Sequence, residues 1–198
     1  MNDTYQEIST VYRREKGVNL IEISLSTMAE LFNPIDPSPL NKKDLEIDVE
    51  DYIVTGIKDF PLKSAVNVII YLPDDEIEEN TSSQINGALN NFFAYRAWST
   101  RNSLRTMFKD ARISLVFGIL TLSTAISCKT ILMKFSSEAW AQAISESLVV
   151  AGWVAMWHPI QKFLYEWWPL RKNLRVYEKL TKVKVECRPH SSSPNSIF

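Results

Sequence analysis

Two long apolar runs, separated by only five residues, constrain this chain more than any other feature of its sequence. The first, residues 113–133, opens with ISLVFGILTLSTAISC and resumes as TILM after Lys129, and the second, residues 139–158, carries the single charge Glu146. A helix needs about 20 residues to cross a hydrocarbon core of about 30 Å. The pattern predicts transmembrane helix 1 over 113–133, an external loop over 134–138 and transmembrane helix 2 over 139–158. The alternative is a pair of buried helices in a soluble core, because short apolar runs fit both structures.

Basic and aromatic residues flank the two runs on one side. The residues expected to anchor the hairpin at the membrane interface are Arg101, Arg105, Lys109, Arg112, Trp153, Trp157, Trp167 and Trp168. Lysine and arginine concentrate on the cytoplasmic side of membrane proteins, and tryptophan favours the headgroup layer. The flanks therefore predict that both chain ends are cytoplasmic, with Trp140 at the opposite interface.

The two ionisable residues within the runs, Lys129 and Glu146, are expected to form an intramembrane charge pair. Charges inside a span are costly unless they are paired or reach water. Counted from the loop, their depths differ by about 4–5 Å at 1.5 Å per residue. In the alternative, Lys129 extends to the interface while Glu146 is protonated or faces a neighbouring subunit.

The charge of the chain is divided between its halves. Residues 1–95 hold 7 Lys/Arg against 17 Asp/Glu, whereas residues 96–198 hold 15 against 6. A basic half suggests an anionic surface as its partner, and its apolar content favours membrane lipids over nucleic acid. We expect no cleavable signal peptide, because the first thirty residues show no apolar stretch behind a basic start. Cys128 and Cys187 provide neither a disulfide framework nor metal-ligand spacing.

The segments outside the runs predict a small cytoplasmic α/β domain over residues 18–95, preceded by an N-terminal arm over residues 1–17. We expect strands at 18–25 and 64–72, and between them a helix capped by Asp48, stapled by Ile47 and Tyr52 and stopped by Pro61. A short strand at LEIDV is the competing interpretation. A further helix, capped within 81–83, is expected to continue through a basic juxtamembrane helix at 96–112 into the first span.

After the second span, Pro159 is expected to kink or interrupt the helix because proline lacks an N–H and clashes with the preceding turn. An interfacial and basic helical segment at 159–180, a strand at 181–188 that joins the cytoplasmic domain, and a disordered tail at 189–198 complete the prediction. The predicted fold class is an α+β membrane protein, in which a two-helix transmembrane hairpin carries a small α/β domain built from the N-terminal part and a C-terminal strand.

Two stretches, LFNPIDPSPLNKKDLEIDVEDYIV and GWVAMWHPIQKFLYEWWPLRKNLRVYEKL, resemble an uncharacterised family of bacterial inner-membrane proteins with two transmembrane helices and a cytoplasmic domain. The resemblance covers about residues 18–188. It implies a location in the bacterial inner membrane and a shared architecture. It supplies no reaction and no functional residue.

No catalytic, cofactor-binding or metal-binding constellation is visible. His158 and His190 lack a partner set, the acidic run at 74–79 lacks the glycine and ligand alternation of a calcium loop, and no GxSxG motif occurs. We therefore expect a membrane-anchored interaction or assembly domain, without enzyme activity, that binds a protein partner or itself. The alternative is a subunit of a small homo-oligomeric channel or transporter, and a lipid-directed membrane enzyme comes third.

Overall fold

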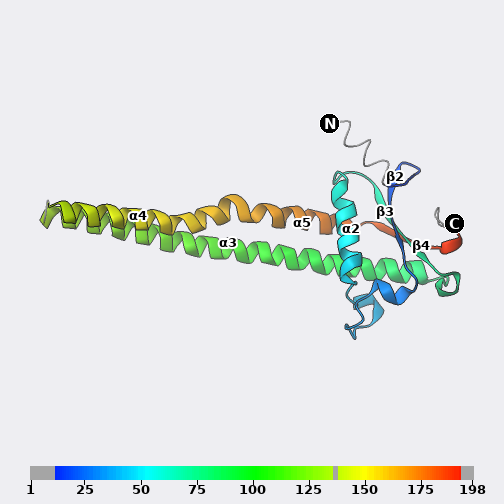
Figure 1. Cartoon of the computed structure of the whole chain (residues 1–198). Helices are drawn as coiled ribbons and strands as arrows, with labels where there is room; N and C mark the ends of the chain where they lie inside the picture. Colours follow the sequence, from blue (N-terminus) through cyan, green and yellow to red (C-terminus); the bar gives the residue numbers. More distant parts are fainter. Residues whose placement is uncertain (1–11, 136–137, 193–198) are drawn as a thin grey trace. The chain divides into compact units, whose positions relative to one another are not determined.

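The computed structural model describes residues 12–135 and 138–192, and it shows a mixed α+β protein in which a small sheet and one very long helix are the dominant elements (Figure 1). The chain divides into two compact units. Unit 1 comprises Met1–Ser99 and Asn173–Phe198, and unit 2 comprises Thr100–Lys172. Each unit is described below by itself.

Unit 1 contains a four-stranded sheet in the order β1-β2-β3-β4. Its strands are β1 (Arg14–Glu15), β2 (Val18–Ser24), β3 (Val66–Leu72) and β4 (Lys184–Pro189). β1 is antiparallel to β2, whereas β2, β3 and β4 are mutually parallel. The predicted strands at 18–25, 64–72 and 181–188 are thus confirmed to within a few residues.

The predicted N-terminal arm needs a correction, because its last residues form a β-hairpin with β2. Lys16 and Gly17 join the two strands with φ values of 49° and 85°. Positive φ at both central residues is typical of the tight turns whose twist matches that of paired strands. Residues 1–11 of the predicted arm lie outside the described residues.

Helix α2 (Ile47–Asp59) confirms the helical interpretation of this segment over the short strand. Its N-cap is Glu46 rather than Asp48, and Asp48 lies in the first turn, where a carboxylate favours the positive end of the helix dipole. Ile47 and Tyr52 are both exposed, so the predicted staple does not form. Phe60 caps the end of the helix, directly before Pro61.

The core of unit 1 lies on one face of the sheet. Alternate strand residues such as Ile21, Ile70 and Val185 pack there with apolar residues of α2, of α3 (Thr81–Phe135) and of α5 (Trp167–Leu180). The helix residues in this core include Ile53, Ile57, Ile85, Leu89, Phe93, Val176 and Leu180. β4 therefore completes a core that the N-terminal part of the chain begins, as predicted.

The outer edge of β4 is closed by α3. The backbone N–H of Val185 donates to Oδ1 of Asn86 (3.1 Å), and that of Cys187 donates to Oγ of Ser82 (3.0 Å). Unpaired strand edges invite pairing with other chains. These two side chains satisfy the edge and end the sheet at β4.

Unit 2 is built from one continuous stretch of α3 and a returning helical segment. α3 is unbroken from Thr81 to Phe135, which confirms the predicted continuation through 96–112 into the apolar run. α4 (Ala139–Gln161) returns, followed by the π-helical turn η4 (Lys162–Glu166) and by α5. Residues 136–137, within the predicted loop at 134–138, lie outside the described residues.

Pro159 does not end the helix, because it lies inside α4 and is fully buried, but the α-helical hydrogen bonding is interrupted shortly after it. The helix absorbs the proline locally: η4 follows within three residues, and the Lys162 N–H donates to the carbonyls of both His158 and Pro159. Pro169 also does not end a helix. It lies in the first turn of α5, which continues directly from η4.

The beginning of the predicted disordered tail is ordered. Pro189 belongs to β4, His190–Ser192 form the short helix η5, and Nε2 of His190 lies 3.0 Å from the carbonyl oxygen of Leu25. Residues 193–198 of the predicted tail lie outside the described residues.

Candidate functional site

The helical hairpin of unit 2 is held by a seam of small buried residues. On α3 these are Ala111, Gly118 and Ala125, and on α4 they are Ser145, Gly152 and Pro159, each set spaced by seven residues. A seven-residue repeat keeps one face of a helix turned towards its partner. Small residues at such a seam let two helix backbones approach closely, which is a typical arrangement in membrane proteins.

The two glycines are the points of closest approach. A Cβ atom on Gly152 would lie 2.9 Å from Cδ1 and 3.1 Å from the Cα of Leu122. A Cβ atom on Gly118 would lie 3.3 Å from the carbonyl oxygen of Ala155. In a regular helix that oxygen would accept the N–H of the residue four positions later, which is Pro159 and has none. Gly118 therefore lets α3 pack against a carbonyl that proline leaves without its helical donor.

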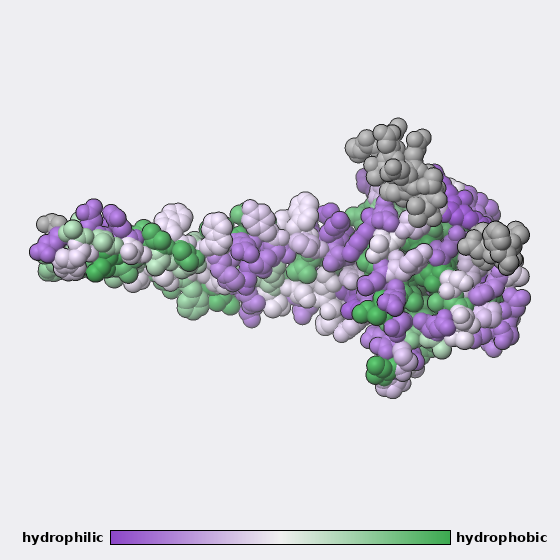
Figure 2. Space-filling model, viewed as in Figure 1, coloured by the Kyte–Doolittle hydropathy of each residue, from purple (hydrophilic) through white to green (hydrophobic). Residues whose placement is uncertain are grey.

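Many large apolar side chains of unit 2 are exposed, and Figure 2 shows patches of apolar surface along its helices. The exposed ones include Ile113, Val116, Phe117, Ile119, Leu120, Ile126, Ile131, Ile144, Val150, Trp153, Val154 and Trp157. Soluble monomers rarely expose contiguous apolar patches of more than a few hundred Å². Unit 2 thus buries small residues fully and leaves many of its large apolar residues exposed.

Of the helices in the described part of the chain, α3 is the one that is long and apolar enough to cross a membrane. Its best 18-residue window has a mean hydropathy of 1.8, and 11% of that window is buried. α4 does not reach the same hydropathy. A membrane-spanning helix is thus indicated once, and the second span stays a prediction.

Hydroxyl groups along the apolar helices are satisfied within their own helix. The side chains of Thr121, Thr124, Ser127, Thr130 and Ser147 each donate to the carbonyl four residues earlier, at 2.8–2.9 Å. This bond removes the need for a water molecule or another chain as acceptor. These hydroxyls therefore give no support to a water-filled path along the hairpin.

The predicted interfacial anchors lie on the helices of unit 2. Arg101, Arg105, Lys109 and Arg112 are exposed on α3, and Trp153, Trp157 and Trp168 are exposed on α4 and α5. Trp167 is half-buried, and the Arg171 guanidinium lies over its ring at 5.7 Å from the centroid. Whether these residues meet headgroups remains a prediction.

A second feature, in unit 1, is the proline-containing loop between Phe32 and Leu45. These two residues close its base as an isolated antiparallel bridge. The carboxylate of Asp36 accepts the backbone N–H of Asp44 (2.7 Å) and of Ser38 (2.9 Å), and these bonds lower the pKa of Asp36. The loop is therefore held in one shape by its own backbone, as its proline content predicts.

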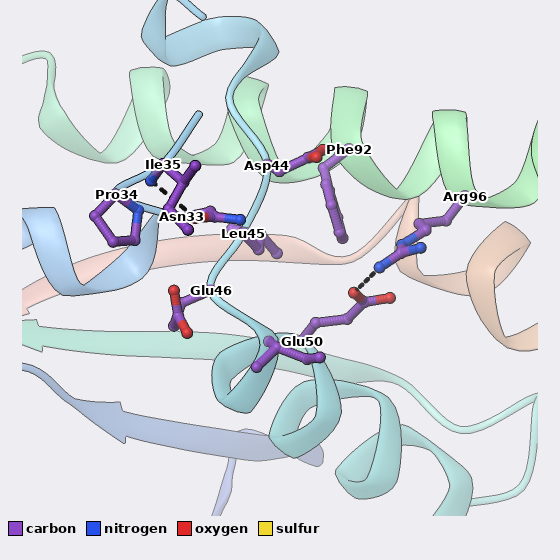
Figure 3. A pocket seen from close by; sticks show the side chains of 10 residues that line it. Asn33, Pro34, Ile35, Asp44, Leu45, Glu46, Glu50, Phe92 and Arg96 are labelled. Atoms are coloured by element: carbon purple, nitrogen blue, oxygen red, sulfur yellow. Dashed lines mark hydrogen bonds and ion pairs between the residues drawn. The ribbon is translucent and has the colours of Figure 1, made fainter. Parts of the chain in front are cut away.

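Two hollows lie beside this loop. One, of about 350 Å³, is lined by loop residues, by the start of α2 and by Phe92 and Arg96 of α3 (Figure 3). The other, of about 600 Å³, is lined by Asp36, Asn41, Lys42, Asn91 and Tyr95, among others. At the first hollow, Ile35 and Ile47 are 87% and 64% exposed. Unit 1 thus presents two uncovered aliphatic side chains on an ordered frame.

An ion pair between a buried carboxylate and a partly exposed guanidinium lines the first hollow. Glu50 of α2 is 5% exposed and pairs with Arg96, whose guanidinium also lies 5.1 Å from the centroid of the Phe92 ring (Figure 3). Burial, and then the negative charge of Glu50, raise the pKa of Tyr177. Sequence reasoning missed this pair. The available signal was that Glu50 lies three residues before Ile53 and seven before Ile57, on the apolar face of its helix.

No cluster of metal-ligating side chains occurs within residues 12–135 and 138–192. The acidic run at 74–79 has a structural use, because the carboxylate of Glu76 accepts the backbone N–H of Met28.

No protein-family model matches the chain, and no curated protein or solved structure matches it either. The bacterial inner-membrane family proposed from sequence resemblance therefore remains an expectation.

Proposed function

We propose that the protein is a membrane-anchored interaction domain. In this proposal unit 2 crosses the bilayer as a two-helix hairpin, and unit 1 lies in the cytoplasm and binds a protein partner through the loop between Phe32 and Leu45. The observation that carries the proposal is the packing of unit 2, with small residues in the seam and many large apolar residues exposed.

The energetic argument concerns what surrounds those outward side chains. Fully burying one large aliphatic or aromatic side chain gains roughly 1.5–3 kcal/mol, so a half-exposed one gains about 1 kcal/mol when lipid replaces water. The exposed set on α3 and α4 would then favour lipid by on the order of 10 kcal/mol. The internal bonding of five hydroxyl groups lowers the polar penalty of that transfer, to which the charges of Lys129 and Glu146 still contribute.

The orientation is inferred from the basic residues. Arg101, Arg105, Lys109 and Arg112 precede the first span, and Lys162, Arg171 and Lys172 follow the second. By the positive-inside rule both chain ends then face the cytoplasm. The resemblance to bacterial inner-membrane proteins makes that membrane the proposed location.

The interaction surface is inferred from the loop. Ile35 is the most exposed large aliphatic residue among those described, and the loop that carries it is fixed before any partner binds. Preorganised apolar groups lose little entropy on binding. Asp44 and Glu46, on the lining of the same hollow, favour a partner that offers basic as well as apolar side chains.

The alternative of a channel or transporter subunit is weaker, because a pore needs polar groups that face water. The candidate hydroxyls donate instead to their own helix.

Topology is tested with reporter fusions at residues 112, 136 and 175. The proposal requires an external signal at 136 alone, and an external signal at 112 or 175 would contradict it. Partner binding is tested by affinity purification in mild detergent, comparing wild type with Ile35→Asp and with the control Leu62→Asp, which changes another exposed apolar residue of unit 1. Loss of a partner from the Ile35 variant alone supports the loop as its site, and equal recovery from both variants removes it.

A further inference from the structure

Lys129 and Glu146 lie at about the same level of the hairpin but do not meet within one chain. The contacts of Gly118 with Met156, and of Gly152 with Leu122, set the antiparallel register of the two helices. Continued towards the loop, this register places Lys129 opposite residues 145–148. Glu146 falls within this range, so the register places the two charges within about one helical turn of the same level.

The rotation of α4 keeps the two charges apart. Ser145 occupies the seam and is fully buried, whereas Glu146 follows about 100° further round the helix and is exposed. Lys129, four residues after the seam residue Ala125, is half-buried. Among the described residues the two form no ion pair, and Glu146 accepts instead a long hydrogen bond of 3.5 Å from Nε2 of Gln142.

Such an arrangement is unfavourable inside a bilayer. Each charge would lie within an apolar run, where ionisable groups are expected to pair or to reach water. Neighbouring acyl chains offer no charge to pair with. Lys129 and Glu146 carry opposite charges at about one depth, so each offers the charge that the other lacks.

We propose that two copies of the chain associate in the membrane through reciprocal pairs, with Lys129 of each copy meeting Glu146 of the partner subunit. This inference rests on the proposed membrane location of unit 2. A two-fold axis along the membrane normal leaves every residue at its own depth, so matching levels within one chain become matching levels between two. A two-fold interface is also self-complementary, because each contact occurs twice with the roles exchanged.

The reciprocal geometry makes a charge-reversal experiment decisive. The variants Lys129→Glu and Glu146→Lys are expressed with different tags, alone and together, and association is measured by tag-specific purification from membranes. In a homodimer of either variant, two like charges meet at each contact. In the mixed dimer both contacts regain opposite charges. Each variant alone should lose at least tenfold in self-association, and the mixed pair should associate like wild type.

Pairing within one chain predicts a different pattern. Opposite charges would then face each other again only in a chain that carries both Lys129→Glu and Glu146→Lys. The mixed pair would associate no better than either variant alone, and this result would overturn the proposal. The neutral variant Lys129→Met/Glu146→Gln, which inserts with the least difficulty, is the second check. It should lose association, and association at the wild-type level would also overturn the proposal.

The same membranes are extracted with carbonate, so failure of the two proposals can be distinguished. Extraction of the wild-type protein would contradict the membrane anchor and with it the dimer. A wild-type protein that resists extraction but is recovered as a monomer would contradict the dimer alone.

Discussion

Alanine substitution at Gly152 should destabilise the hairpin of unit 2, whereas the same substitution at two other glycines should not. An alanine in a helix interior is favoured over glycine by about 0.8–1.0 kcal/mol. At Gly152 the new methyl group would lie 3.1 Å from the Cα of Leu122, so the backbones must separate. Overpacking of this kind costs about 1–3 kcal/mol. The expected net loss is about 0.5–2 kcal/mol, the difference between those two effects.

The controls differ only in what the methyl group meets. At Gly118 it would lie 2.8 Å from Sδ of Met156, the end of a flexible side chain that can rotate away, and 3.3 Å from the carbonyl oxygen of Ala155, which must shift by a few tenths of an ångström. The gain in helix preference and this milder overpacking should offset each other to within about 0.5 kcal/mol. At Gly87 nothing lies within 4 Å, and alanine should stabilise by up to about 1 kcal/mol. Stability is measured by unfolding in mixed micelles of mild detergent and SDS, followed by circular dichroism. A Gly152 variant as stable as the Gly118 variant would refute the close approach of the two helices.

Three further predictions concern unit 1. Arg96→Met should lower the free energy of unfolding by about 1–3 kcal/mol in a urea titration, because Glu50 is buried and would lose its only positively charged partner among the described residues, keeping only Tyr177 beside it; the added change Glu50→Gln should recover part of this loss, and a strictly additive result would argue against the pair. Deleting residues 184–198 should make residues 18–95 sensitive to limited proteolysis, since β3 would lose its β4 partner; unchanged resistance would contradict this. The hydrogen bonds to Asp36 lower its pKa, so they should stabilise the loop fully at pH values above the unfolded pKa near 3.9 and be lost as the pH falls through the lower folded pKa. The protection factors of the amides of Ser38 and Asp44, which correct for the intrinsic pH dependence of exchange, should fall in that range, and unchanged protection factors would contradict this.

Most of the sheet could be predicted from the sequence because its strands carry strong local patterns. VNLIEIS and VNVIIYL combine β-branched residues with a buried face, and both form strands. β1 could not be predicted in this way, because Arg14 and Glu15 have no apolar pattern and pair only through the turn at Lys16 and Gly17. A two-residue strand depends on its neighbour, which local sequence does not show.

The helical segment after the second apolar run shows where a local rule fails. Proline predicts a break at Pro159, yet the seam buries this residue and η4 absorbs the change in hydrogen bonding. Helix continuity there depends on packing against α3, where Gly118 makes room for the Ala155 carbonyl. The sequence contained both residues, but their juxtaposition follows only from the register of the two helices.

The candidate sites, too, could be predicted from the sequence only in part. Counting residues from the loop brought Lys129 and Glu146 close in depth, and the helical register places them at about the same level. The direction in which Glu146 lies around α4 could not be derived by counting residues, because it depends on whether Ser145 or Glu146 packs in the seam. The hollow beside Ile35 also escaped prediction, since residues from the loop, α2 and α3 form it only once folded.

The most direct test of the membrane anchor is the labelling of single cysteines in native membranes with a water-soluble maleimide. Cys128 and Leu120 both lie on the exposed surface of unit 2, Leu120 with 58% of its surface free. In a Cys187→Ala background, the Arg112→Cys variant should be labelled at position 112, whereas Cys128 should not be labelled. When Cys128 is also replaced by alanine, the Leu120→Cys variant should not be labelled either. All three positions should react after the membrane is dissolved in SDS. If the cysteines at 120 and 128 reacted in intact membranes as fast as the one at 112, water rather than lipid would surround the hairpin, and the central claim would be contradicted.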